Sequence, residues 1–465
     1  MAFLSWPSNA ASSKAAAFRV LPSHAANLQA RGSHWRAGRE ELLSSGSWAA
    51  IAASLAAGAR LAARPTKPRR RGCCRHATAD LSPDLDRASS SASTGFFNNP
   101  AKVGESADLL LRVAHQQDNC RRTPVWLMRQ AGRYLKEFRA YAERYPFRQR
   151  SETPSMATEL SLQCWRRYGM DGVIMFSDIL TPLPALGIEF DIVRGRGPIV
   201  LGDLGRTLED RLAGPNGIRA ITNPEDFLRT HGFVRETLHA LARETQDKCT
   251  LLGFVGAPWT LGAYAVEGGS TKDASVFHRW MYERPDVVDE FLKRLATSLA
   301  SYAIFQVQSG AQCIQIFESW AHCLTPDQWK RFAAPHVFQI ANEIHRACPE
   351  VPLIYFANGG SSYLRDQVDT LKDVVEVLAV DQGMRMAEAA DIAAGSGLVL
   401  QGNVDPFILR YGSEKDIRDA VRRTIDEAGG PGKHILNLGH GVLQGTPEDN
   451  VRYFVEEAQA YTGIA

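Results

Sequence analysis

Eight short apolar runs, separated by longer helical patterns, constrain the fold of this 465-residue chain more than any other feature. Each run is apolar on both faces, as is typical of strands in a parallel sheet that is covered on each side. Two of the patterns between them predict helices over residues 287–308 and 327–346. The runs cover residues 125–128, 173–176, 251–255, 313–317, 353–356, 377–380, 398–400 and 435–438.

This alternation predicts an α/β fold, a single-domain (β/α)8 TIM barrel. Such a barrel needs about 250 residues plus insertions, which the body of the chain supplies. The run at 125–128 is the weakest of the eight. The alternative is a doubly wound open sheet, which uses the same elements in another order.

Polar residues follow almost every run. In a (β/α)8 barrel the carboxyl ends of the strands meet on one face, and that face carries the active site. The sequence therefore predicts a functional site there. The residues that directly follow or end the runs include Arg129, Asp178, Glu318, Ser319, Asn358, Asp381, Asn403 and His440.

The formal net charge of +2 is divided unevenly along the chain. Residues 1–79 contain twelve Lys and Arg against two Glu, so they carry +10 and the remainder carries −8. The first stretch is rich in Ala and Ser, which is typical of an organelle transit peptide. A nucleic-acid-binding arm and a disordered tail are the alternatives, because residues 69–71 form a short basic run.

A Ser-rich polar linker is expected to follow the leader, over residues 80–98. We therefore expect a cleaved or disordered segment at 1–98 and the barrel at 99–465. The leader's length and composition favour the plastid stroma, with the mitochondrion as the alternative. Its longest apolar run, 49–59, is shorter than the ~20 residues that a membrane span needs, so no membrane span is expected.

Arg129 and Arg133 are the first candidate site residues. They are four residues apart, so a helical turn would place both guanidinium groups on one face. Arginine binds carboxylate and phosphate through two parallel hydrogen bonds, which predicts an anionic ligand. The alternative is a surface helix whose arginines pair with Glu137 and Asp171, each pair contributing about 1 kcal/mol at most.

Asp178 is the second candidate, because it directly follows an apolar strand. A buried carboxylate costs several kcal/mol unless it is paired or accepts hydrogen bonds. Its predicted role is that of a general base or of a receptor for a cationic or N–H-rich ligand. The structural alternative is a cap on the next helix.

Residues 256–270 are expected to form a long Gly-rich loop between a strand and a helix. This loop would offer backbone N–H groups to an anion and a hydroxyl group at Tyr264. Ser319 adds a hydroxyl group after another run. His440 lies between two glycines, a setting that disfavours a packed core histidine, and the alternative is a strand-end cap.

Common cofactor motifs are absent from the sequence. There is no GxGxxG, no P-loop and no HExxH. The six cysteines beyond residue 79 form no CxxC pair or zinc-finger spacing. The residues alone therefore predict a barrel enzyme for a polyanionic small molecule, with no metal, cofactor or nucleic acid.

Several motifs together closely resemble the uroporphyrinogen decarboxylase family. They occur in the family's order from about residue 124 to residue 451. The matching segments are MRQAGRYL (128–135), FSDIL (176–180), GAPWT (256–260) with Tyr264 and the EGG at 267–269, FES (317–319) and NLGHG (437–441).

This resemblance implies a (β/α)8 barrel, a homodimer, and conversion of the four acetate groups of uroporphyrinogen III to methyl groups, giving coproporphyrinogen III without a cofactor. It belongs to the porphyrin pathway to heme and chlorophyll, and the leader resembles that of plastid forms. Arg129 and Arg133 would bind carboxylates, one of them a candidate proton donor. Asp178 would accept the pyrrole N–H groups. The peripheral contacts would come from Tyr264, Ser319 and His440, with less support for Arg139.

Two other functions fit parts of the pattern. A zinc-dependent corrinoid methyltransferase of the same superfamily would share the fold, but its His and Cys ligand spacing is missing here. A non-catalytic tetrapyrrole-binding protein should lack Asp178 or one of the arginines, whereas this chain has all of them.

Overall fold

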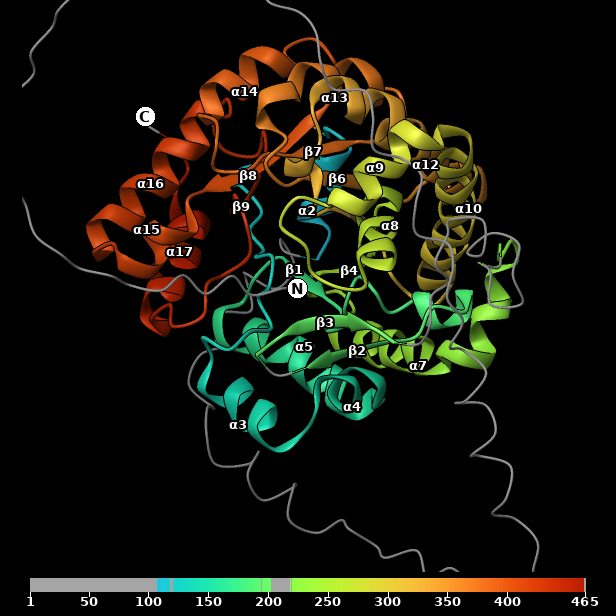
Figure 1. The fold of residues 1–465 in the computed structure, drawn as a ribbon. Helices are drawn as coiled ribbons and strands as arrows, with labels where there is room; N and C mark the ends of the chain where they lie inside the picture. Colours follow the sequence, from blue (N-terminus) through green and yellow to red (C-terminus); the bar gives the residue numbers. More distant parts are fainter. Residues whose placement is uncertain (1–106, 118–119, 194, 202–217, 219, 464–465) are drawn as a thin grey trace, which may run out of the picture. The chain divides into compact units, whose positions relative to one another are not determined.

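The computed structural model describes residues 107–117, 120–193, 195–201, 218 and 220–463. In this part of the chain, seven parallel strands form one sheet in the order β1, β4, β5, β6, β7, β8, β9, with helices packed around it (Figure 1). Each of the last seven predicted runs overlaps one of these strands. The strands are β1 Gly172–Ile174, β4 Thr250–Gly256, β5 Cys313–Glu318, β6 Leu353–Ala357, β7 Val377–Ala379, β8 Val399–Val404 and β9 Ile435–Leu438.

The run at 125–128 closes the sheet but does not form a full strand. Val125 pairs in parallel with Leu436 of β9, and its carbonyl accepts the N–H of Asp171 at 2.8 Å, directly before β1. The pairing stops early because the N–H of Met128 donates to the side chain of Asn437 at 3.1 Å. The (β/α)8-type barrel is thus confirmed, with a bridge in place of the eighth strand, and the doubly wound sheet is wrong.

The helices cover the outside of the sheet (Figure 1). The predicted helix at 287–308 is α10 (Pro285–Gln308). The one predicted at 327–346 is divided into α11 (Pro326–Gln328), a π-helical turn at Trp329–Ala333 and α12 (Ala334–Ala347). We attribute the division to Pro335, which has no N–H for the helical ladder.

The remaining helices are α2 Leu109–Ala114, α3 Lys136–Arg144, α4 Phe147–Glu152, α5 Pro154–Tyr168, α7 Leu228–Thr245, α8 Pro258–Glu267, α9 Ser275–Glu283, α13 Leu364–Leu371, α14 Met386–Ala393, α15 Pro406–Tyr411, α16 Glu414–Glu427 and α17 Glu448–Ala460.

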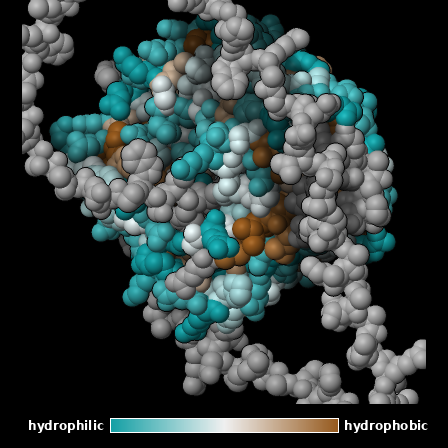
Figure 2. Space-filling model, in the orientation of Figure 1, coloured by the Kyte–Doolittle hydropathy of each residue, from teal (hydrophilic) through white to brown (hydrophobic). Residues whose placement is uncertain are grey.

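A small antiparallel hairpin, β2 (Phe190–Val193) and β3 (Gly197–Val200), is inserted between β1 and β4. The N–H of Val200 donates to the carbonyl of Gly268 at 2.9 Å, so the hairpin is tied to the end of α8. Figure 2 shows apolar surface beside the hairpin on a face that is otherwise largely hydrophilic. Leu201, which follows β3, is 41% exposed.

Three side chains form a hydrogen-bonded network inside the sheet. The indole N–H of Trp126 donates to Gln401 at 2.9 Å, and Gln401 donates to Gln315 at 3.1 Å. All three side chains are fully buried. A buried amide is tolerated when its hydrogen bonds are made. This network therefore fixes the packing of the segment at Trp126 against β5 and β8.

Residues 1–98, the predicted leader and linker, lie outside the described residues, so that division of the chain stays a prediction. None of the helices in the described part of the chain is both long and apolar enough to cross a membrane.

Candidate active site

Five of the six predicted site residues follow segments of the barrel sheet. Arg129 follows the bridging segment, Asp178 follows β1, and Ser319 is the residue after β5. Tyr264 lies on α8, the helix after β4, and His440 is two residues beyond β9. The predicted gathering of polar groups at the carboxyl ends of the strands is therefore present.

Asp178 lies in a turn and does not cap a helix. Its side chain is buried, and Oδ1 accepts the N–H of Leu180 at 3.0 Å. The hydroxyl of Thr181 accepts the N–H of Asp178 at 3.3 Å. The next element is a single 3-10 turn at Leu183–Leu186, so the prediction of a helix cap is wrong. The local bonds hold the carboxylate in one orientation.

Arg129 is placed by an unusual backbone and by a glycine opposite it. Its φ of 60° lies in the left-handed region, which a non-glycine residue rarely adopts. A Cβ atom at Gly441 would lie 2.3 Å from Cδ of Arg129, so only glycine leaves room for this side chain. Burial lowers the pKa of Arg129, while Tyr264 and Asp178 act to raise it. Arg129, Asp178 and Tyr264 thus lie within electrostatic reach of one another.

Tyr264 is a buried phenol in this group. Burial raises its pKa well above the usual 10, and the negative charge of Asp178 adds to the effect. Its ring packs edge-on against Trp320, with centroids 5.4 Å apart. Tyr264 therefore stays protonated at neutral pH and can donate a hydrogen bond.

His440 completes what we call the strand-end cluster, which consists of Arg129, Asp178, Tyr264 and His440. Burial lowers the pKa of His440 to about 3, and Arg129 lowers it further, as does His322 to a smaller extent. The imidazole is therefore neutral at physiological pH. Sequence reasoning missed His322, because it belongs to none of the motifs and only the folded chain brings it near His440.

Arg133 does not share a helical face with Arg129. Residues 129–135 form turns, and α3 begins only at Lys136, so the spacing argument was wrong. Arg133 is exposed, and its Nη1 donates to the side chain of Gln444 at 3.4 Å. Gln444 belongs to the same loop as His440, so Arg133 lies beside this loop.

Arg139 has a structural role in this segment. Its Nη1 donates to the carbonyls of Arg133 and Tyr134 at 3.0 and 2.8 Å. These bonds hold the turn before α3 and do not support the weaker prediction of a ligand contact.

The predicted surface ion pairs also do not form, because both acids have other partners. Glu137 binds Arg167 at 3.0 Å and Asp171 binds Arg122 at 2.6 Å.

The predicted long loop at 256–270 is largely helix. Strand β4 ends at Gly256 and α8 begins at Pro258, because proline suits the first turn of a helix. The N–H of Thr260, one of the groups expected to bind an anion, donates instead to Glu318 Oε1 at 2.9 Å. This end of α8 is therefore bound by a protein carboxyl group.

Three further strand-end residues serve the loops. Asn358 donates to the carbonyl of Ser319 at 3.1 Å. Asp381 accepts from Gly359, Ser361 and Gly383, and Asn403 donates to the carbonyl of Asp381 at 2.9 Å. The polar residues after β6, β7 and β8 thus fix the shape of this side of the barrel.

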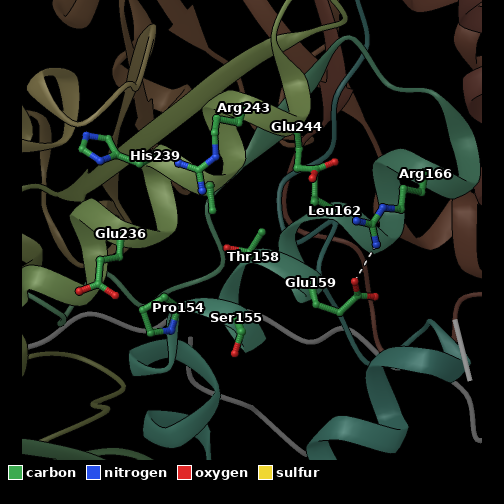
Figure 3. Close-up of a pocket in the computed structure, with 11 residues that line it drawn as sticks. Pro154, Ser155, Thr158, Glu159, Leu162, Arg166, Glu236, His239, Arg243 and Glu244 are labelled. Carbon is green, nitrogen blue, oxygen red and sulfur yellow. Dashed lines mark hydrogen bonds and ion pairs between the residues drawn. The ribbon is translucent and has the colours of Figure 1, made fainter. Parts of the chain in front are cut away.

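A groove of about 550 Å³ lies elsewhere, between α5 and α7 (Figure 3). Its charged lining mixes acids with bases, among them Glu159, Arg166, Glu236 and Arg243. None of the predicted site residues lines it. In the described part of the chain, no group of three or more His, Cys, Asp or Glu side chains is arranged to hold a metal ion.

An α/β barrel with a buried aspartate, an arginine, a phenol and a neutral imidazole at its strand ends has the architecture of a barrel enzyme. The family model described as uroporphyrinogen decarboxylase (URO-D) matches residues 105–461. The chain belongs to the uroporphyrinogen decarboxylase family.

Curated relatives agree with this assignment, and a solved structure shares the fold. "Uroporphyrinogen decarboxylase" of Picosynechococcus sp. is 44% identical over 349 residues, covering 75% of this chain and 95% of the relative. "Uroporphyrinogen decarboxylase 1, chloroplastic" of Oryza sativa subsp. japonica is 43% identical, covering 75% and 83%. A methyltransferase from Methanosarcina mazei has a TM-score of 0.64 at 20% identity, covering 76% of this chain and 98% of that one. This last likeness concerns the fold.

Proposed function

We infer that the chain is a decarboxylase of porphyrin biosynthesis, and we propose that it converts the four acetate groups of uroporphyrinogen III to methyl groups without a metal or prosthetic group. The product is coproporphyrinogen III, with four CO₂ released. The observation that carries the proposal is the strand-end cluster, in which a buried carboxylate lies near a half-buried guanidinium and two neutral donors.

The substrate itself supplies the electron sink in this proposal. Protonation of a pyrrole carbon makes the ring electron-poor, so the bond between the acetate methylene and its carboxylate breaks and its electron pair enters the ring. CO₂ leaves, the methylene carbon takes up one proton to become a methyl group, and the ring carbon loses the proton it gained. Each cycle therefore consumes one proton per CO₂.

Asp178 is proposed to accept the central pyrrole N–H groups and to stabilise the positive charge that develops on the ring. A preorganised charge of this kind is typically worth several kcal/mol of transition-state stabilisation. Arg129 is proposed to bind a substrate carboxylate through two hydrogen bonds. Arg133, Tyr264, Ser319 and His440 would contact the peripheral groups, and Arg129 or Arg133 is the candidate proton donor.

The proposed working form is a homodimer in the plastid stroma, after removal of the leader, with the barrel at 99–465. Support comes from the +10 charge of residues 1–79 and from the chloroplastic rice relative. Sequencing the amino terminus of the protein from cells should find a start between about Arg71 and Phe97. An intact Met1 would contradict a cleaved leader, and a monomer by light scattering would contradict the dimer.

The reaction is tested by anaerobic incubation of the mature protein with uroporphyrinogen III, with and without a chelator. We expect coproporphyrinogen III in both cases. Failure to form it would contradict the decarboxylase. Loss of turnover with the chelator would contradict the metal-independent reaction and favour a metal-dependent one.

A further inference from the structure

Glu318, the last residue of β5, is a fully buried acid that the proposed reaction does not use. Its two oxygens have very different surroundings. Oε1 accepts the N–H of Thr260 at 2.9 Å and the hydroxyl of the same residue at 2.5 Å. Oε2 is shielded from solvent and has no hydrogen-bond partner among the described residues.

This asymmetry favours the protonated acid. A carboxylate spreads its charge over both oxygens, and a buried charge without a donor costs several kcal/mol. A carboxylic acid keeps Oε1 as the acceptor of both bonds and carries its proton on Oε2. Burial accordingly raises the pKa of Glu318 to about 8, and the bonds from Thr260 offset only part of this rise.

The same carboxyl group joins two elements that carry predicted site residues. The hydroxyl of Thr260, on α8, accepts the N–H of Trp320 at 3.2 Å, and the indole N–H of Trp259 donates to the carbonyl of Trp320 at 3.2 Å. Ser319 lies between Glu318 and Trp320. Tyr264 lies one helical turn beyond Thr260, and its ring packs against Trp320.

We propose that Glu318 is a positioning residue, which locks the start of α8 to the end of β5 and thereby sets the places of Tyr264 and Ser319 in the active site. The part of this proposal that is tested by turnover rests on the proposed decarboxylase function. Ionisation of Glu318 would place an uncompensated charge between the start of α8 and the end of β5. The contact between these two elements should then loosen, and turnover should fall as the pH rises above about 8.

The groups around Glu318 allow this effect to be isolated. From β6 and the turn after it, Tyr355 and Tyr363 face Glu318, and burial raises the pKa of both phenols well above 10. The hydroxyl of Thr260, on α8, does not titrate. Among the described residues that face this position, Glu318 is therefore the group expected to ionise near pH 8.

The test compares Glu318→Gln and Glu318→Ala with Glu376→Gln as the matched control. Glu376 also accepts a backbone N–H, that of Leu353 at 2.7 Å, but it precedes β7 at the opposite end of the barrel. We expect Glu318→Gln to keep turnover at pH 7 within about threefold, since its amide oxygen can accept both bonds from Thr260, and to remove the alkaline fall near pH 8. Glu376→Gln should keep that fall.

Glu318→Ala should lower kcat at pH 7 by roughly tenfold or more, as loss of a buried bonding group does. If this variant does not fold, Thr260→Val removes the hydroxyl that links Glu318 to Trp320 and should lower kcat in the same direction. The proposal would be overturned if Glu318→Gln lost turnover at alkaline pH as the wild type does. It would also be overturned if Thr260→Val kept the kcat of the wild type.

An infrared titration separates this proposal from the proposed function. The carbonyl band of a protonated carboxyl group should disappear near pH 8 in the wild type and be missing in Glu318→Gln. If the wild type shows this band but does not turn over uroporphyrinogen III, the decarboxylase proposal fails and the protonated Glu318 stands. If turnover is present and the band is missing, the Glu318 proposal fails alone.

Discussion

Asp178 and Asp381 occupy equivalent places on opposite sides of the barrel sheet, but their surroundings differ. Asp178 lies four residues beyond β1 and Asp381 two residues beyond β7, and both are buried. Asp381 accepts three bonds from its own and a neighbouring loop: from Ser361 and Gly383 at 2.6 Å each, and from Gly359 at 2.8 Å. Asp178 accepts one N–H from its own turn, that of Leu180, and its charge acts on the charged and phenolic groups of the strand-end cluster.

This difference teaches that a polar residue at a strand end is not by itself a site residue. The side of the barrel formed by β6, β7 and β8 uses such residues to hold loops together. The side formed by the bridging segment, β1, β4, β5 and β9 brings Arg129, Asp178, Tyr264 and His440 within electrostatic reach of one another; Figure 1 shows where these strands lie. If the comparison is correct, equal substitutions on the two sides should have unequal consequences.

Asp178→Asn should produce the largest effect on catalysis. The amide keeps the shape but loses the charge, so kcat should fall by roughly 10²–10³-fold, as on removal of one preorganised electrostatic group. The melting temperature should change little. Anaerobic turnover and a thermal melt measure both, and near wild-type rates would remove Asp178 from its role.

Asp381→Asn is the matched variant on the other side. It replaces one of the two acceptor oxygens with an NH₂ group, which cannot accept the N–H of Gly359, and this should lower the free energy of unfolding by about 1–3 kcal/mol. Urea unfolding measures that loss. The specific activity of the folded fraction should stay near that of the wild type, and a loss as large as that of Asp178→Asn would erase the distinction between the two sides.

Arg129→Lys should weaken substrate binding by roughly 10–100-fold, because a lysine cannot make the two parallel bonds of a guanidinium group. Arg139→Lys is the control, since Arg139 bonds only backbone carbonyls in the interactions described above. The two KM values decide this point. Equal values would show that Arg129 contacts no carboxylate.

The buried His434, at the start of β9, predicts a pH dependence of stability. His434 directly precedes this strand and is fully buried, and burial lowers its pKa to about 3. As the pH falls below about 6.5, the unfolded chain binds a proton that the folded chain does not, so stability falls until about pH 3.

His434→Gln should therefore reduce the loss of stability on acidification by about 1.4 kcal/mol per pH unit between pH 6 and 4. Urea unfolding at several pH values measures how the free energy of unfolding changes with pH in the wild type and in the variant. Equal slopes in the two proteins would mean that His434 is already charged in the folded state. Turnover should remain close to that of the wild type. His440→Gln, at the other end of the strand, should lower turnover.

Tyr264→Phe should have the smallest effect. It removes one neutral hydroxyl from the strand-end cluster, which is worth about 0.5–1.5 kcal/mol, or a few-fold to tenfold in kcat/KM. Tyr282→Phe, which alters a tyrosine that is 77% exposed on α9, is the control. Equal rates in both variants would place Tyr264 outside the site.

The sequence predicted the barrel and named all four residues of the strand-end cluster, because both depend on local patterns. Apolar runs mark strands, and the residue after a run is carried to one end of the barrel. Arg129 and Arg133 were placed on a helix wrongly, because spacing does not reveal the left-handed backbone at Arg129 or the turns that follow it. The pattern of polar strand ends alone could not tell Asp381 from Asp178, since Arg129 and Tyr264 near Asp178, and Gly359 and Ser361 near Asp381, come from other segments.

Glu318 also shows what a local sequence pattern can and cannot predict. Its place at the end of an apolar run was visible, but its two bonds to Thr260 join residues 58 positions apart. Its neutral state follows from the complete burial of one oxygen. Neither feature can be derived from the pattern of a single strand.

A structure of the protein with coproporphyrinogen III bound tests the central claim most directly. We expect the pyrrole N–H groups to lie within about 3 Å of the Asp178 carboxylate, with Arg129 on a propionate of the ring. A tetrapyrrole bound in the groove between α5 and α7, or one whose nitrogen atoms point away from Asp178, would contradict this account.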